Sequence, residues 1–297
     1  MMSKARRLRQ CIEGPELLVM PGAFDPMSAR IIEKTGYDAV QCSGLGISGT
    51  LLGKPDYSML AMSDMALATQ RIAEAVDIPV MADGDTGFGN AVNVFFTIRA
   101  FEAAGAAGIN LEDQVMPKRC GHLDGKEVIP VEEAVAKIKA AADARVDPDF
   151  VINARTDALG VEGIEAVIRR GNAYLEAGAT MIFVEGIASK QAIAQVTREI
   201  RGPVGVNIVH GGKSGDFDLA DLQEIGVARV SLPGVLIQSA YAAMEDCLLT
   251  IRDSGKTGTV ADRMYPFHKL HDLMGTPEVN ALEEKYLAPL KQALDAR

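Results

Sequence analysis

The stretch VMPKRCGHLDGKEVIP (115–130) holds one of the four cysteines of the chain, beside groups that carry or can carry positive charge. Those groups are Lys118, Arg119 and His122. Their charge is expected to favour the thiolate of Cys120, and such a cysteine can act as a nucleophile or as a general acid. Gly121 suits a loop that changes shape to exclude water. We therefore predict a catalytic loop here, and not merely a basic surface loop.

Carboxylates follow two other apolar runs. Asp83 and Asp85 stand two residues apart after IPVMA, and Glu112 follows GINL. If the first run is a strand that continues to residue 85, both aspartates face the same side. Carboxylate oxygens without cysteine or histidine pairs nearby suit Mg²⁺ or Mn²⁺ better than zinc. We predict a metal site at these three residues; the alternative is that one aspartate caps a helix and the other is solvated.

These residues need a scaffold to hold them, and the hydrophobic pattern predicts one. Short apolar runs alternate with amphipathic helical patterns, and the expected strands are residues 17–24, 38–44, 78–85, 108–114, 150–157, 181–187, 203–209 and 228–234. Eight buried strands alternating with helices favour an α/β fold, a (β/α)8 TIM barrel, over a doubly wound open sheet. No change in composition divides the chain. We expect a single domain over residues 1–297, with a C-terminal helical extension over about 236–297.

In such a barrel the active site lies where the strands end. Almost every expected strand ends in polar side chains, which are Ser43, Asp83, Glu112, Asn153, Arg155, Glu185 and Asn207. This convergence predicts an enzyme. The cysteine loop follows the fourth strand, so we expect it to lie over the same opening.

Composition narrows the classes of function. The net charge of −10 argues against a nucleic-acid partner and requires local cations for any anionic substrate. No apolar run reaches the roughly 18 residues of a membrane span, so no membrane partner is expected. The N-terminal residues lack the pattern of a secretory signal, and the four scattered cysteines form neither a CxxC pair nor a disulfide framework. We expect a cytoplasmic protein.

Beyond these physical arguments, the motifs CSGLGIS, LGKPD, DGDTGFGN, GINLEDQ, PKRCGH, ARTDA and NIV occur in this order over about residues 17–240. In these motifs and their order, the chain resembles the isocitrate lyase and phosphoenolpyruvate mutase superfamily, in its lyase branch. The resemblance implies a barrel whose last helix swaps between subunits, in a homotetramer built from two such dimers. It also implies a Mg²⁺-dependent lyase that cleaves the carbon–carbon bond next to the hydroxyl of a 2-hydroxy acid. One product is an α-keto acid, and the other leaves as a carboxylate-stabilised carbanion.

The resemblance assigns roles to individual residues. Asp85 holds the metal, with Asp83 and Glu112 acting directly or through water, and Asp56 lies near the metal's waters. Cys120 protonates the carbanion, and the expected catalytic set is Lys118, Cys120, His122 and Arg155. The expected substrate-binding set is Ser43, Gly44, Leu45, Gly121, Arg155, Glu185 and Asn207. No residue is assigned as the base that deprotonates the hydroxyl group.

Two departures from the family pattern bear on the substrate. Gln238 stands where tricarboxylate lyases carry an arginine, and His210 replaces an acid in NIVHGGKSG. A dicarboxylate is therefore expected, with 2,3-dimethylmalate, which gives pyruvate and propionate, as the first choice. Methylisocitrate, which gives pyruvate and succinate, is the second. Hydrolysis of oxaloacetate on the same scaffold is a further alternative.

Other classes of function explain fewer residues. A phosphonopyruvate mutase or decarboxylase is disfavoured because those relatives lack the KRCGH cysteine. A thiol hydrolase using Cys120 and His122 leaves the three carboxylates without a role. A barrel that only binds or assembles would be expected to have lost Asp85, Cys120 or Arg155, and all three are present.

Overall fold

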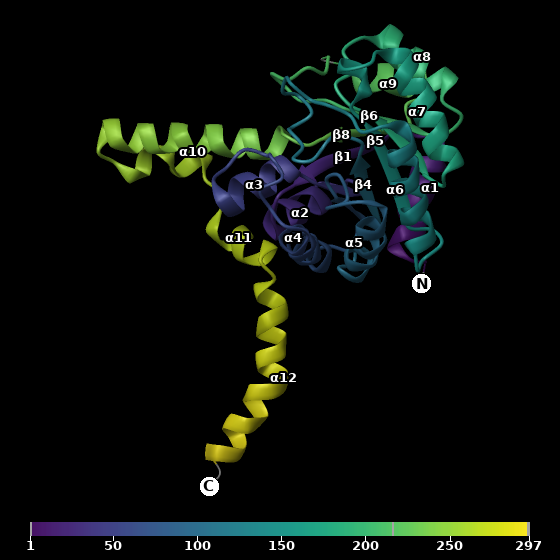
Figure 1. Ribbon diagram of the computed structural model, residues 1–297. Helices are drawn as coiled ribbons and strands as arrows, with labels where there is room; N and C mark the ends of the chain where they lie inside the picture. The colour runs from purple at the N-terminus through teal and green to yellow at the C-terminus, as the bar shows by residue number, and fades with distance from the viewer. Residues whose placement is uncertain (1, 216, 296–297) are drawn as a thin grey trace. The chain divides into compact units, whose positions relative to one another are not determined.

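The computed structural model describes residues 2–215 and 217–295 and contains a closed barrel of eight parallel strands (Figure 1). The strands follow one another round the barrel in chain order: β1 (Leu18–Ala23), β2 (Val40–Cys42), β3 (Val80–Asp83), β4 (Gly108–Glu112), β5 (Val151–Thr156), β6 (Met181–Val184), β7 (Val204–Asn207) and β8 (Arg229–Leu232). Each expected strand is present but shorter than expected, since the chain leaves the sheet at or next to the polar residues. The (β/α)8 barrel is confirmed, and the open sheet is wrong.

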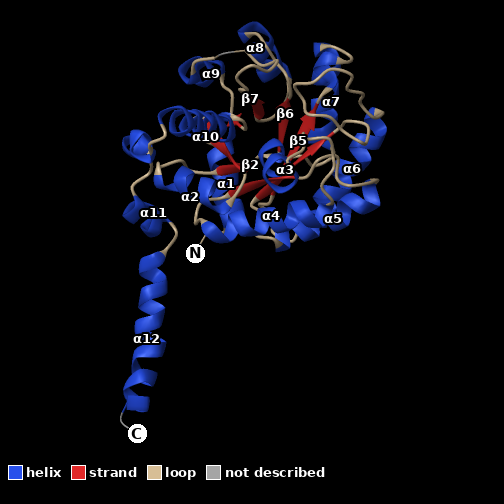
Figure 2. Cartoon of the chain, turned by 90° about the vertical axis from the view of Figure 1, so that its left-hand side faces the viewer, coloured by secondary structure: helices blue, strands red, loops and turns tan. Residues whose placement is uncertain are grey.

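Helices connect the strands and surround the barrel (Figure 2). They are α1 (Lys4–Glu13), α2 (Pro26–Lys34), α3 (Gly44–Leu52), α4 (Met62–Ala75), α5 (Ala91–Ala103), α6 (Val131–Ala144), the short 3₁₀ helix η1 (Ala158–Gly160), α7 (Ile164–Glu176), α8 (Lys190–Glu199) and α9 (Leu219–Ile225). Several begin at a residue whose side chain accepts hydrogen bonds from the first turn. Asp25, Asn90 and Ser189 do so for α2, α5 and α8. These caps satisfy backbone N–H groups that have no partner within the helix.

The N-terminal end of the barrel is closed by apolar packing. Leu8 and Ile12 of α1 belong to one buried cluster with side chains at the strand starts, among them Leu18, Met20 and Met181. Full burial of each such side chain stabilises the fold by about 1.5–3 kcal/mol. A ligand can therefore enter the barrel only from the opposite, C-terminal end.

The strand register brings polar residues to one level at that end. Glu112 of β4 pairs with Arg155 of β5, and Asn207 of β7 pairs with Ser231 of β8. Because side chains alternate along a strand, paired residues of neighbouring strands point to the same face of the sheet. The strand ends thus carry polar side chains, whereas the strand starts are mainly apolar, apart from the fully buried Arg229 of β8.

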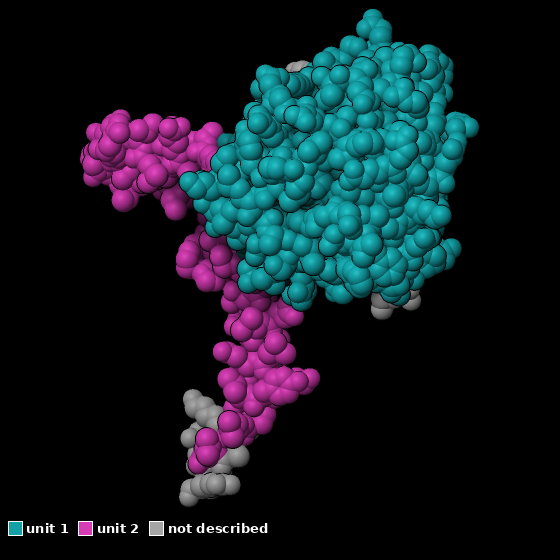
Figure 3. Space-filling view, viewed as in Figure 1, with its two compact units in different colours: residues 1–238 teal, residues 239–297 magenta. Residues whose placement is uncertain are grey.

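The chain divides into two compact units, residues 1–238 and residues 239–297 (Figure 3). The second unit contains most of α10 (Val235–Ser254), followed by the 3₁₀ helix η2 (Thr257–Arg263), α11 (Phe267–Leu273) and α12 (Thr276–Asp295). Several large apolar side chains of α10 are exposed: Tyr241, Met244, Leu248 and Leu249. Among the described residues, none of the helices combines the length and the apolar character that crossing a membrane requires.

Candidate active site

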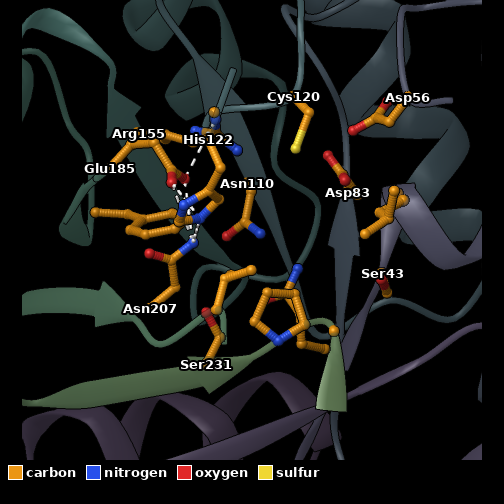
Figure 4. Close-up of a pocket in the computed structure, with 18 of the residues that line it drawn as sticks. Ser43, Asp56, Asp83, Asn110, Cys120, His122, Arg155, Glu185, Asn207 and Ser231 are labelled. Carbon is orange, nitrogen blue, oxygen red and sulfur yellow. Dashed lines mark hydrogen bonds and ion pairs between the residues drawn. The ribbon is translucent and has the colours of Figure 1, made fainter. Parts of the chain in front are cut away.

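The C-terminal strand ends line an open cavity (Figure 4). Most of the predicted site residues line it: Ser43, Gly44, Leu45, Asp56, Asp83, Cys120, Gly121, His122, Arg155, Glu185 and Asn207. Three predicted residues do not line this cavity but are buried near it, namely Asp85, Glu112 and Lys118. The predicted residues from six of the eight strand ends and from the cysteine loop therefore meet in one place.

One wall of the cavity is the start of α3. The Ser43 hydroxyl accepts a hydrogen bond from the Gly46 N–H at 3.1 Å and caps the helix. A Cβ atom at Gly44 would overlap the carboxylate of Asp83, so only glycine lets the backbone approach this closely. The backbone N–H groups of Gly44 and Leu45 belong to the first turn of a helix, where the helix dipole favours an anion. This wall suits a substrate carboxylate.

Lys118 lies among the acidic residues. Its Nζ is 2.6 Å from Asp56 Oδ2 and 3.0 Å from Asp85 Oδ1, and its side chain is 1% exposed. Burial would lower the pKa of Lys118, but the surrounding carboxylates raise it well above its ordinary value. Lys118 therefore offsets the charge of the acids and keeps its own proton.

Burial has the opposite effect on the acids themselves. It raises the pKa of Asp85 to about 7, although Lys118 opposes the shift. It also raises the pKa of Asp83, and it raises that of Glu112 well above its ordinary value. Removal from water and mutual repulsion both disfavour the charged forms of these carboxylates, so added cationic charge would stabilise them.

The prediction that Asp83 and Asp85 share one strand is wrong. β3 ends at Asp83, and Asp85 has a φ of 45°, in the left-handed region. Its N–H donates to Asp83 Oδ1 at 3.2 Å, and its side chain lines a small cavity together with Asp56. The two carboxylates are neighbours because the chain turns between them, and strand alternation does not explain their proximity.

The donor set suits Mg²⁺. Within residues 2–215 and 217–295, no three His, Cys, Asp or Glu side chains converge as a ready-made metal cage. Mg²⁺ does not require such a cage, since it is usually bound through one or two carboxylates and keeps several waters. One buried carboxylate oxygen of the acid group, Glu112 Oε1, has no hydrogen-bond partner among the described atoms. Hard oxygen donors with unsatisfied negative charge fit the expected ion better than zinc.

Arg155 forms the opposite side of the cavity. Its guanidinium lies 2.9 Å from Asp157, 3.1 Å from Glu112 and 3.2 Å from Glu185. Burial would lower the pKa of Arg155, but these three acids raise it well above its ordinary value. The guanidinium is therefore permanently charged and held in a fixed orientation.

His122 has a defined tautomer. Its Nδ1 accepts a hydrogen bond from the Lys213 N–H at 2.9 Å, so the ring proton lies on Nε2. Nε2 lies 3.0 Å from Glu185 Oε1 and 3.2 Å from Asn207 Nδ2. With both ring nitrogens engaged, His122 is not placed to take a proton from Cys120, and this disfavours a Cys–His hydrolase.

The expectation that Cys120 favours its thiolate is wrong. Burial raises the pKa of the Cys120 thiol, and Asp56 and Glu185 add to the shift. The adjacent lysine has little influence because Asp56 and Asp85 neutralise it. Figure 4 shows Cys120 between two groups of charged residues. Its thiol keeps its proton at neutral pH, as a general acid requires.

Sequence reasoning did not assign a role to two residues beside the site. Asp157 contacts Arg155, and Lys126 contacts both Asp157 and the cysteine loop. Asp157 is fully buried. Asp157 directly follows the fifth strand in the motif ARTDA. A polar residue at a strand end is the sequence signal that could have identified it as a site residue.

Gln238 and His210, the two residues that differ from the family pattern, lie next to each other. Gln238 Nε2 donates to the carbonyl oxygen of His210 at 3.3 Å. Gly234, which lines the cavity, lies against the Gln238 side chain. A neutral amide therefore stands at this edge of the cavity.

Comparison with known proteins agrees with the geometry. The family model described as phosphoenolpyruvate phosphomutase matches residues 8–252. A 2,3-dimethylmalate lyase from Eubacterium barkeri is 42% identical over 96% of this chain and 99% of that protein. A 2-methylisocitrate lyase from Aeropyrum pernix is 40% identical over 90% of this chain and 86% of that protein.

Solved structures give the same result. An oxaloacetate acetylhydrolase in complex with 3,3-difluorooxalacetate has a TM-score of 0.90 and 33% identity, over 95% of this chain and 97% of that chain. A phosphonopyruvate hydrolase in complex with oxalate and Mg²⁺ has a TM-score of 0.87 and 33% identity, over 96% of this chain and 100% of that chain. The chain therefore belongs to the phosphoenolpyruvate mutase/isocitrate lyase superfamily, in its lyase branch.

Proposed function

We propose that the protein is a Mg²⁺-dependent carbon–carbon lyase that cleaves 2,3-dimethylmalate to pyruvate and propionate. The position of Cys120 is the observation that carries this proposal. Its protonated thiol lies in the cavity between a carboxylate group suited to Mg²⁺ and the fixed guanidinium of Arg155. A proton donor at that point fits a reaction that ends by protonating a carbanion.

The residues of the site have complementary tasks in this reaction. Arg155 and the amides of Gly44 and Leu45 hold the carboxylates of the substrate and of its keto-acid fragment. Cys120 gives its proton to the carbanion carbon as the second fragment leaves. Asp85, with Asp83 and Glu112 directly or through water, would hold Mg²⁺, which when bound would supply positive charge where negative charge accumulates.

The choice of a dicarboxylate depends on the edge of the cavity. Gln238 and His210 supply neither a fixed cation for a third carboxylate nor the acid of the family pattern. The 42% identity to a protein named 2,3-dimethylmalate lyase supports the same choice. A methylisocitrate lyase remains the alternative among the lyases, as the second relative indicates.

A second candidate function is hydrolysis of oxaloacetate. A TM-score of 0.90 to an oxaloacetate acetylhydrolase, equal to that of a solved 2,3-dimethylmalate lyase, supports it as an alternative. In that reaction water attacks a carbonyl group and Arg155 holds the same kind of dianion.

One assay separates these functions. Release of the 2-oxo acid is followed by coupling to lactate dehydrogenase, with Mg²⁺ present, and dimethylmalate, methylisocitrate and isocitrate are offered separately; the first two would give pyruvate and isocitrate would give glyoxylate. Oxaloacetate consumption is followed by its own absorbance. We expect pyruvate from dimethylmalate. Pyruvate mainly from methylisocitrate would refute the argument from Gln238, and consumption of oxaloacetate alone would assign the protein to the hydrolases.

The quaternary structure belongs to the same proposal. We infer a homotetramer of two helix-swapped dimers in the cytoplasm. The apolar side chains that α10 exposes, such as Leu248 at 68%, support packing against a second copy of the chain. Light scattering on the purified protein gives its mass directly.

A further inference from the structure

Lys126 lies near the end of the cysteine loop and reaches back across it. Its Nζ donates to the carbonyl oxygen of Gly121 at 2.6 Å and lies 2.8 Å from Asp157 Oδ1. The side chains of Lys126 and Asp157 are 6% and 0% exposed. A lysine buried to this degree needs both partners, because an unpaired charge in the interior is costly.

Asp157 is shared between the loop and the substrate-binding arginine. Besides Lys126, it accepts hydrogen bonds from Arg155 Nε at 2.9 Å and from Arg155 Nη2 at 3.2 Å. One carboxylate thus fixes a cation from the loop and a cation from β5. Movement of either cation changes the hydrogen bonding of the other.

The scaffold behind Asp157 is rigid. Its backbone N–H donates to Asp113 Oδ1 at 2.9 Å. Asp113 Oδ2 in turn accepts from Thr156 Oγ1 at 2.7 Å and from the Tyr174 hydroxyl at 2.8 Å. Asp157 is therefore a fixed anchor to which the loop attaches.

The loop also contacts Arg155 from its other side, so the interactions form a closed ring. Arg155 Nη2 lies 3.2 Å from Glu185, and Glu185 lies 3.0 Å from His122, the residue after Gly121. A Cβ atom at Gly121 would overlap the side chains of Arg155 and Glu185. The backbone beside Cys120 is therefore packed directly on the substrate-binding group.

We propose that Lys126 is a positioning residue that fixes Cys120 in the cavity and couples the closed state of its loop to the orientation of Arg155. This inference rests on the proposed role of Cys120 as proton donor. In this arrangement a dianion bound to Arg155 and the contact between Lys126 and Asp157 stabilise the same closed state. Loss of Lys126 then loosens the loop and weakens the effect of the ligand on it.

Alkylation of Cys120 measures the opening of the loop without any turnover. For this experiment Cys11→Ser and Cys247→Ser are introduced into every variant. Cys120 and the buried Cys42 are then the remaining thiols. Burial raises the pKa of the Cys42 thiol to about 12, which keeps it unreactive. The rate of reaction with iodoacetamide is followed by mass spectrometry, with and without oxalate plus Mg²⁺ as the probe.

Lys126→Met is expected to raise the rate of Cys120 alkylation by about 10-fold or more and to reduce the protection by oxalate. Lys126→Arg can reach the same two partners and is expected to restore most of the protection. With dimethylmalate, Lys126→Met is expected to lower kcat more than it raises KM, because the proton donor is misplaced while Arg155 remains.

Lys213→Met is the matched control. Lys213 Nζ contacts Asp124 and the Leu123 carbonyl oxygen on the same loop, but the Lys213 and Asp124 side chains are 42% and 97% exposed. The His122 contact uses the backbone N–H of Lys213 and survives this substitution. An exposed ion pair contributes little, so alkylation is expected to change by less than about twofold.

Asp157→Asn provides a second route if Lys126→Met does not fold, as judged by circular dichroism, and is expected to expose Cys120 in the same way. An unchanged alkylation rate and full oxalate protection in the folded Lys126 or Asp157 variant would overturn the proposal. Equal exposure of Cys120 in Lys213→Met would also overturn it, since any loop lysine would then act alike. If Lys126→Met exposes Cys120 but the parent protein cleaves no candidate substrate, the proposed function fails and the positioning role stands.

Discussion

At the scale of single residues, the chemistry of Cys120 depends on burial more than on its neighbours in the sequence. Lysine, arginine and histidine beside a cysteine predict a thiolate, but the lysine charge is directed to Asp56 and Asp85. Burial then keeps the thiol protonated. Sequence identifies which residues are present, whereas which charges neutralise one another depends on the fold.

A proton donor has a definite pH dependence. The pKa of Cys120 lies above its ordinary value of 9.0, and the acid must be protonated to act. With saturating Mg²⁺, we therefore expect ionisation of the thiol to leave kcat unchanged through neutral pH and to lower it only in the alkaline range, beyond about pH 9. A pH–rate profile in which kcat rises as the thiol ionises would instead indicate a nucleophilic thiolate.

Replacing the thiol tests the same residue. Cys120→Ser is expected to lower kcat by about 10²–10⁴-fold, the usual contribution of a general acid, with little change in thermal stability. The control is Cys247→Ser, because Cys247 lies on α10 and does not line the cavity. A folded Cys120→Ser enzyme with unchanged kcat would exclude the proton-donor role.

At the scale of elements, the ends of β3 and β4 bring carboxylate side chains close together in a buried space. Glu112 ends β4, and Asp85 follows β3 in a turn with positive φ. The folded-state pKa of Asp85, about 7, lies above its ordinary 3.8, so the folded protein binds this proton more tightly than the unfolded chain. Its contribution to stability is therefore fully present below about pH 4 and is lost as the pH rises towards 7.

Bound Mg²⁺ should reduce the loss of folding stability that follows ionisation of Asp85. We expect it to raise the melting temperature more at pH 8 than at pH 6, because at pH 6 protons compete for Asp85. The measurement is a thermal melt with Mg²⁺ or with EDTA at both pH values, and Asp85→Asn should abolish most of the difference. An equal Mg²⁺ effect at both pH values, retained in Asp85→Asn, would place the metal elsewhere.

The elements also show how far sequence reasoning reaches. All eight strands were predictable, since buried parallel strands are apolar throughout and their polar ends stand out. The positive φ of Asp85 was not, because non-glycine residues rarely adopt it. The contact between Lys126 and Asp157 was not predictable either, since it joins residues 31 positions apart.

At the scale of the whole molecule, the second unit contains exposed apolar side chains on α10. Leu248 of α10 is 68% exposed. If α10 packs on another subunit, Leu248→Glu buries a charge in that interface and favours smaller species. We expect multi-angle light scattering to show a lower mass for Leu248→Glu than for the exposed-site control Glu245→Gln. Equal masses for both variants would remove α10 from the assembly interface.

The central claim is that Cys120 protonates the carbanion left by cleavage, and deuterium labelling tests it most directly. Dimethylmalate is cleaved in D₂O with Mg²⁺ by the wild-type enzyme and by Cys120→Ser, and the propionate is converted to the ester of a chiral alcohol and analysed by NMR. We predict one deuterium per propionate, at C2 and in a single configuration, from the wild-type enzyme. From Cys120→Ser we predict slow cleavage with loss of that configuration. Propionate of the same configuration formed at the same rate by both enzymes would contradict the account.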